Sequence, residues 1–318
     1  MDDCGSHANS CLVWHRRQLT NREKSAYIQA VKCLQQKPTI YGVGTAIPGA
    51  VSRFDDFHGV HISQTMSIHF VGHFLPWHRY FVATYEKALR EECHYTGAQP
   101  YWDWSIDADK GTDYNDSPIF DATTGFGGDG SYVDAPGFFV VPGHTGGGCV
   151  MNGPFVNMQV HVGPLGSLTR NDRCLTRDFA AEIIYNFANT EKVNGVLSKT
   201  TFTDFTRAVD GEPNWTAMGI HGPGHFGVGG EAGDMFSSPG EPLFYLHHAN
   251  VDRIWWKWQS GDIQQRLLDI GGPVKMMDYS GPNVTLSQPI TLGLLAPDIT
   301  AKETMSILGG PGNLCYIY

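Results

Sequence analysis

The stretch HFVGHFLPWHRYF, residues 69–81, is the feature that most restricts what this chain can fold into. It places three of the chain's 14 histidines among aromatic and aliphatic residues within thirteen positions. A polar group that is buried without a partner costs roughly 1–3 kcal/mol, so a core that includes this stretch must satisfy its imidazole nitrogens. Metal ions commonly bind neutral imidazole. The stretch therefore indicates a buried polar site, with a metal as the first candidate partner.

Histidines gather in two regions of the chain. In the second region the motif HGPGH separates two histidines by four residues, which places both rings on one face of a helix. The first region holds His61, His69 and His78, and the second holds His221, His225, His247 and His248. A single histidine of this kind is usually a hydrogen-bonded core or surface residue, and the spaced pair alone is ambiguous. Two such regions in aromatic surroundings favour a metal site.

The ligand chemistry narrows the choice of metal. Imidazole-rich sites suit Zn, Cu, Fe or Ni. A dizinc hydrolase normally adds carboxylate ligands, and the sequence has no repeated carboxylate pattern beside these histidines. Copper ions held by three imidazoles each fit best, because neutral nitrogen donors stabilise Cu(I) and leave one face open for dioxygen.

Two short segments of the sequence repeat the same plan. FLPWHRYF and FYLHHANV each place a phenylalanine four residues before a histidine: Phe74 before His78, and Phe244 before His248. The repeat is typical of two halves of one site, although aromatic helix starts can also look alike by chance.

Composition excludes several kinds of partner. The formal charge of −10 disfavours nucleic acid and anionic membrane surfaces, and no apolar run is long enough to span a bilayer. None of the seven cysteines forms a CxxC pair, and three N-x-S/T triplets occur, at Asn115, Asn214 and Asn283. These features favour a secreted, disulfide-bonded glycoprotein.

Periodicity and capping signals predict a mainly helical chain. We expect helices at 19–36, from about residue 54, at 78–93 with Pro76 just before the start, at 176–189, near 202–209 and at 247–259. We expect residues 103–153 to form an ordered surface segment within the same domain. We expect the last 45 residues to form short strands and loops.

The motifs FHGVH, HFVGHFLPWHRYF, PYWDW, HGPGH and EPLFYLHHANVDRIWWKW resemble those of the type-3 dicopper proteins. More closely, the chain resembles the short secreted tyrosinase and catechol oxidase (polyphenol oxidase) family of filamentous fungi. The resemblance implies a mainly α fold in which a four-helix bundle carries a dicopper centre, with long loops and a few short strands. It also implies a single catalytic domain over residues 1–318, without the C-terminal domain that covers the site in family proenzymes.

The resemblance also implies the ligands of two copper ions. Copper A would be held by His61, His69 and His78, and copper B by His221, His225 and His248. His247 would then be a neighbour of the site, Phe244 would pack beneath the copper pair, and Asp252 would orient a ligand imidazole.

Other positions bear on the substrate. Met235 matches a gate residue over copper A. Glu212 matches an acid that orients a water for phenol deprotonation in related enzymes, but its usual asparagine partner is replaced by Gly222. The expected reaction is therefore the oxidation of small o-diphenols to o-quinones by O2, with weak or variable monophenol hydroxylation. A full tyrosinase and a haemocyanin-like dioxygen carrier remain the alternatives.

Overall fold

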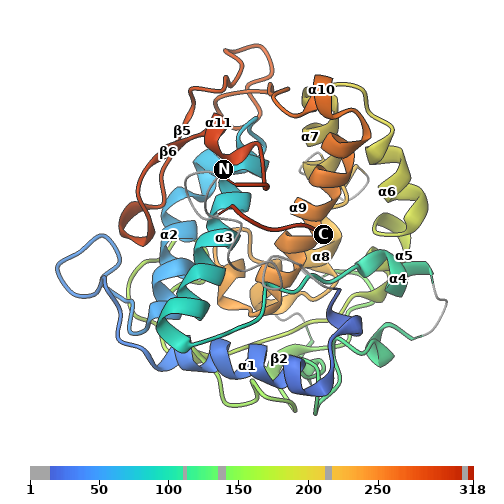
Figure 1. The fold of residues 1–318 in the computed structure, drawn as a ribbon. Helices are drawn as coiled ribbons and strands as arrows, with labels where there is room; N and C mark the ends of the chain where they lie inside the picture. The colour runs from blue at the N-terminus through green and yellow to red at the C-terminus, as the bar shows by residue number, and fades with distance from the viewer. Residues whose placement is uncertain (1–14, 110–112, 135–140, 212–216, 310–313) are drawn as a thin grey trace.

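A computed structural model describes residues 15–109, 113–134, 141–211, 217–309 and 314–318 (Figure 1). Helices dominate these ranges, and the strands in them form three two-stranded antiparallel sheets. The mainly α prediction is confirmed. None of the described helices is long and apolar enough to cross a membrane.

The helices are α1 (Asn21–Gln36), α2 (Arg53–Ile68), α3 (Phe74–Cys93), α4 (Trp104–Asp109), α5 (Ala181–Phe187), α6 (Thr190–Leu197), α7 (Phe202–Asp210), α8 (Gly222–Phe226), α9 (Leu243–Gly261), α10 (Ile263–Arg266) and α11 (Ala301–Thr304). The strands are β1 (Gly130–Tyr132), β2 (Gly147–Val150), β3 (Gln159–Val160), β4 (Arg173–Cys174), β5 (Pro289–Ile290) and β6 (Ile299–Thr300). β1 pairs with β2, β3 with β4, and β5 with β6.

Local sequence explains where the first helices begin. Thr20 and Glu23 form a reciprocal capping box at the start of α1, and Ser52 and Asp55 form one at the start of α2. Such boxes satisfy backbone N–H groups that have no acceptor within the helix. The predicted helices at 19–36 and from about residue 54 are therefore confirmed.

The predicted start of α3 is wrong by four residues. The helix begins at Phe74, so Pro76 lies inside its first turn and not before it. Proline is tolerated there because first-turn N–H groups lack an intrahelical acceptor in any case. The helix therefore includes the whole second half of the histidine-rich stretch.

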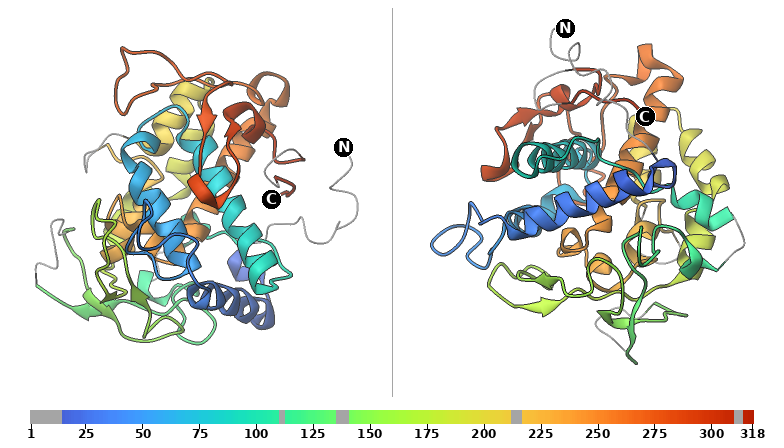
Figure 2. Two further views of the ribbon diagram at one scale, coloured as in Figure 1. Left: turned by 90° about the vertical axis from the view of Figure 1, so that its left-hand side faces the viewer. Right: turned by 60° about the horizontal axis from the view of Figure 1, so that its bottom comes forward.

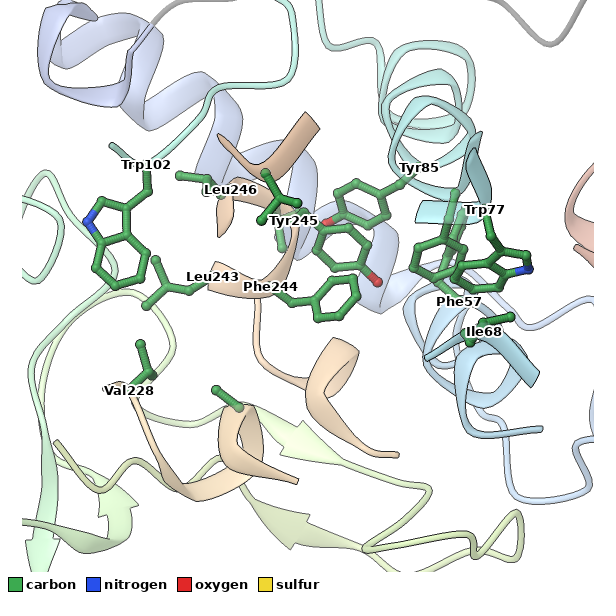
Figure 3. Packing of buried hydrophobic residues seen from close by; sticks show 14 of the residues in the cluster. Phe57, Ile68, Trp77, Tyr85, Trp102, Val228, Leu243, Phe244, Tyr245 and Leu246 are labelled. Carbon is green, nitrogen blue, oxygen red and sulfur yellow. The ribbon is translucent and has the colours of Figure 1, made fainter. Parts of the chain in front are cut away.

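The core lies where α2, α3 and α9 pack together, with the single turn α8 beside α9 as the fourth helix (Figure 1). Figure 3 shows Tyr245 of α9 facing Tyr85 of α3, and the two rings stack with centroids 3.5 Å apart. The helix α1 lies across α2 and α3, as the views in Figure 2 show. This aromatic packing fixes α3 against α9, and these two helices carry the histidines of the repeated Phe–His plan.

Disulfide bonds join distant parts of the fold. Cys33 of α1 is bonded to Cys93 at the end of α3, and Cys149 of β2 to Cys174 of β4. Cys315 is also disulfide-bonded. The prediction of a disulfide-bonded chain is confirmed. Cys4 and Cys11 lie outside the described residues.

Candidate metal centre

The first histidine group is built by α2, α3 and the turn between them. His61 lies within α2, His69 follows its last residue, and His78 lies in the second turn of α3. The turn is tight because Phe70 takes a left-handed backbone conformation (φ 53°), and the Phe70 N–H donates to Asp210 at 2.6 Å. The three ring centroids lie 5.1, 5.2 and 5.7 Å apart. Residues spaced eight and nine apart in sequence therefore converge.

The second group is built by α8 and α9. His221 caps α8, His225 lies in the same single turn, and His248 lies in α9. The Nε2 atom of His225 is 2.8 Å from Nε2 of His221 and 3.2 Å from Nε2 of His248. Gly224 allows α8 to pack closely against His247 of α9, because a Cβ atom there would lie 2.1 Å from Nδ1 of His247. The HGPGH spacing thus brings two rings to one face, as predicted.

The two groups are neighbours in one buried site. The rings of His78 and His248 stack with centroids 4.5 Å apart and planes 12° from parallel. The rings of His69 and His221 lie 6.2 Å apart. The two groups of ring nitrogens that could each hold a metal ion therefore lie side by side.

The repeated phenylalanines line this site from both halves. Phe74 contacts His78 on its own helix at 4.6 Å between centroids, and His221 of the other group at 4.7 Å. Phe244 likewise contacts His248 at 4.2 Å and His61 of the other group at 5.4 Å. Each phenylalanine ring thus packs against both histidine groups.

Hydrogen bonds decide which ring nitrogen can bind a metal. A backbone carbonyl only accepts, so an Nδ1 atom bonded to one carries the proton and leaves the Nε2 lone pair free. This arrangement holds for His61 with the carbonyl of Phe236 (2.9 Å), His69 with Thr65 (2.9 Å), His78 with Phe74 (2.9 Å) and His225 with Ala232 (3.0 Å). The Nε2 atoms of His61 and His78 are buried without a partner among the described residues. Lone pairs that converge without a donor fit a cation between them.

The two adjacent histidines, His247 and His248, differ in the hydrogen bonds of their ring nitrogens. Nδ1 of His247 accepts a hydrogen bond from the indole N–H of Trp104 at 3.1 Å, so a neutral His247 ring carries its proton on Nε2. Trp104 belongs to the PYWDW motif. His248 instead directs its Nε2 toward His225. The geometry therefore favours His248 as the ligand and His247 as a neighbour, although both lie within the same histidine cluster.

Burial keeps five of these imidazole rings neutral. Desolvation lowers the pKa of His69 to about 4 and the pKa values of His61, His78, His225 and His248 well below 6.5. Neighbouring imidazoles lower these pKa values further, as they do for His61, His78, His225 and His248. Neutral rings at physiological pH are the form that binds a metal.

The expectation for Asp252 is wrong. One oxygen of its carboxylate pairs with Arg79, and the other accepts from the hydroxyls of Tyr316 (2.5 Å) and Tyr318 (2.6 Å). The carboxylate that contacts a histidine of the site is Asp210, whose Oδ1 lies 3.2 Å from Nδ1 of His221. No sequence pattern indicated Asp210, because it lies eleven residues before His221 at the end of another helix, α7.

Two of the remaining predicted residues, Gly222 and Met235, are described by the structure. Gly222 is the first residue of α8, and a Cβ atom there would lie 2.5 Å from Cγ of Met218. Met235 is half-buried and precedes Phe236, whose carbonyl contacts His61. Glu212 lies outside the described residues.

A helical core that brings together two adjacent buried histidine groups, each able to hold a metal ion, is the arrangement expected of a dinuclear metal site. The family model for the common central domain of tyrosinase matches residues 51–261, which include all the histidines of both groups. The chain belongs to the tyrosinase family.

Relatives and solved structures agree with this assignment. The chain is 35% identical to tyrosinase P of Aspergillus terreus, over 95% of this chain and 90% of that protein. It is 34% identical to the N-acetyl-6-hydroxytryptophan oxidase of Emericella nidulans, over 94% of this chain and 90% of that protein.

Among solved structures, a mutant polyphenol oxidase from Thermothelomyces thermophila superposes with a TM-score of 0.88 and 38% identity, over 98% of this chain and 89% of that one. A functional unit of octopus hemocyanin gives a TM-score of 0.50 and 19% identity, over 80% of this chain and 55% of that one. The second likeness shows the shared fold alone.

Proposed function

We propose that this chain is a dicopper polyphenol oxidase that oxidises small o-diphenols to o-quinones with O2. His61, His69 and His78 would hold one copper ion, and His221, His225 and His248 the other. The observation that carries the proposal is the set of hydrogen bonds that place the protons of four rings on Nδ1 and so aim their Nε2 lone pairs into two adjacent triads. Copper, when bound, supplies the transfer of electrons from the phenol to O2.

The reaction balances without any further reactant. Two o-diphenols each lose two electrons and two protons and become o-quinones, and one O2 takes up the four electrons and four protons to give two waters. The protein's own contribution is to hold neutral rings in place and to keep water away from them. Phe74 and Phe244 do this from opposite halves of the site.

Exposure indicates where a phenol approaches. His221 and His225 keep 6% and 9% of their surface exposed, whereas His61 and His248 keep 0% and 1%. The site is therefore less deeply covered at these α8 histidines than at His61 and His248. Gly222 is the first residue of α8 and supplies no side chain that could help deprotonate a monophenol. We therefore infer that o-diphenols are the preferred substrates and that monophenol hydroxylation is weak.

We also propose that the chain is secreted. The disulfides Cys33–Cys93 and Cys149–Cys174 favour an oxidising compartment. The sequon residues Asn115 and Asn283 are exposed, as N-glycosylation requires, and Asn214 lies outside the described residues. Detection of the glycosylated chain in the medium of expressing cells tests this proposal, and exclusive recovery from the cell interior would refute it.

Oxygen uptake by the copper-loaded protein tests the proposed activity. With catechol we expect consumption of about one O2 per two quinones formed, and with phenol at the same concentration a slow or lagging response. His248→Ala should abolish both. His94→Asn is a matched control, since His94 is exposed at the end of α3 and its left-handed backbone (φ 56°) suits asparagine. Reversible O2 binding without turnover of catechol would instead indicate a dioxygen carrier.

A further inference from the structure

One segment of chain touches both histidine groups. Residues 230–240, which we call the bridging segment, consist of two 3-10 turns and the link between them. The carbonyl of Ala232 accepts from Nδ1 of His225 at 3.0 Å, and the carbonyl of Phe236 accepts from Nδ1 of His61 at 2.9 Å. The bridging segment therefore sets the tautomer and the direction of one ring in each group.

The bridging segment is fixed by a buried polar cluster that the proposed reaction does not use. Glu231 is 5% exposed, and its Oε1 accepts from the hydroxyl of Ser237 at 2.5 Å and from the guanidinium of Arg173 at 2.7 Å. Arg173 also donates to the Ser237 hydroxyl at 3.2 Å. Glu231 directly precedes Ala232 and Ser237 directly follows Phe236, the two residues whose carbonyls accept from the histidines. The contact between Glu231 and Ser237 therefore closes the segment into a compact loop.

Helix α2 contacts the same polar cluster through His58. Nε2 of His58 lies 2.8 Å from the Ser237 hydroxyl and 3.6 Å from Oε1 of Glu231. His58 precedes His61 by three residues, so α2 meets the bridging segment through both of these rings. Arg173 lies in β4, which disulfide bonding ties to β2. The cluster thus anchors the bridging segment on α2 and on β4 together.

The energetics of the cluster argue against an incidental contact. Burial raises the pKa of the Glu231 carboxyl to about 7, although Arg173 and Ser237 pull it down. A carboxyl buried at this cost persists only where its bonds are satisfied. Hydrophobic residues would fill the same space without that cost, so the cluster indicates a requirement for geometry.

We propose that Glu231 is a positioning residue that, through Ser237 and Arg173, holds the bridging segment and so fixes His61 and His225 for metal binding in both halves of the site. The proposal rests on the proposed function only in taking these histidines as copper ligands. Loss of Glu231 loosens both metal positions together, whereas loss of a ligand histidine affects one position first. Partners that orient ligand histidines typically change metal affinity by about 10–100-fold when they are removed.

Release of copper to an excess of chelator tests the proposal. We expect Glu231→Ala and Ser237→Ala to release both copper ions about tenfold faster than the wild-type protein, and Glu231→Gln to release them at an intermediate rate because its amide oxygen can still accept. Asp107→Asn is the matched control. Asp107 is 4% exposed, and its carboxylate contacts Arg17 and Trp102, not the described residues of the bridging segment. Its loss therefore tests general destabilisation. Its copper release should match the wild-type rate.

A second measurement does not depend on copper. In the copper-free protein, the Nδ1–H protons of His61 and His225 should exchange with solvent more slowly than those of exposed histidines, and both should exchange faster in the Glu231 and Ser237 variants. Nitrogen-15 NMR of labelled histidine reports this exchange.

Three results would overturn the proposal. The first is unchanged copper release in folded Glu231→Ala and Ser237→Ala. The second is faster release of only one of the two ions. The third is equal acceleration in Asp107→Asn. A wild-type protein that holds two copper ions but leaves catechol unoxidised would refute the proposed function and still permit this test.

Discussion

Gly222 follows His221 directly and is the first residue of α8. A phenol of pKa about 10 must lose its proton before it can be hydroxylated near neutral pH, which costs about 1.4 kcal/mol for each pKa unit. A diphenol needs only to be oxidised. A glycine here therefore removes one means of assisting the more demanding reaction.

Gly222→Asn should raise the ratio of monophenol to diphenol turnover by about threefold or more, because one added side-chain hydrogen bond is worth about 0.5–1.5 kcal/mol. Met218 must shift to admit the new Cβ atom. Gly222→Ala is the control, since it moves Met218 in the same way but adds no amide. Initial rates on matched phenol and catechol, with copper content checked, give the ratio. An unchanged ratio in Gly222→Asn, or an equal rise in Gly222→Ala, would exclude this role.

Residue patterns in the sequence identified all six imidazoles of the two triads as candidates, because histidine is rare and its spacing is visible. They could not separate His247 from His248 on physical grounds, since the separating contact comes from Trp104, far away in sequence. The orienting carbonyls of Ala232 and Phe236 were also invisible, because a backbone acceptor has no residue signature.

At the scale of elements, helix existence was predictable from capping and periodicity, as α1 and α2 show. The start of α3 was not, because proline in a first turn and proline before a helix look the same in sequence. The HGPGH motif predicted a helical face at α8 but not how short this helix is. The helix stays ordered through its place between α9 and the 3-10 turn Gly230–Gly233, which is a property of tertiary packing.

The C-terminal residues Tyr316 and Tyr318 contact two of the helices that carry the histidines. The hydroxyls of Tyr316 and Tyr318 both donate to Asp252 of α9, and Arg79 of α3 pairs with the same carboxylate while lying 3.6 Å from the ring of Trp255. This buried contact joins the chain end to the two helices that carry His78 and His248.

Replacing both tyrosines by phenylalanine should lower the free energy of unfolding by about 2–4 kcal/mol, because each hydroxyl makes a hydrogen bond to a buried charge. Urea unfolding of the copper-loaded protein measures the loss. Tyr132→Phe is the control, since Tyr132 is 65% exposed and should leave stability unchanged. Equal midpoints for the double variant and the control would show that the tail contributes no stability through Asp252.

At the scale of the whole molecule, buried histidines make stability depend on pH. Burial lowers the pKa of His15 to about 4, of His58 to about 3 and of His69 to about 4, from 6.5. Between these values and 6.5 the unfolded chain binds more protons than the folded chain, so folding stability rises with pH across this window. The stability present above pH 6.5 is lost as the pH falls through about 4.

The copper-free protein should therefore lose stability steeply between pH 6.5 and 4, by on the order of 3 kcal/mol for a group shifted from 6.5 to about 4. Bound copper should move this loss to lower pH, because protons and metal compete for the same ring nitrogens. Denaturant unfolding of both forms at a series of pH values checks the prediction. A copper-free protein of equal stability at pH 7 and pH 4.5 would contradict the burial of these rings.

The central claim is that six particular histidines hold two copper ions, and metal analysis of purified, copper-saturated protein tests it most directly. The account predicts two copper ions per chain for the wild-type protein and for His247→Gln, and one or fewer for His78→Ala and for His248→Ala. The variants with Ala at 78 or 248 should also lose all oxidation of catechol. Two copper ions retained in His248→Ala but lost from His247→Gln would contradict the assignment, and so would a wild-type protein that binds zinc in preference to copper.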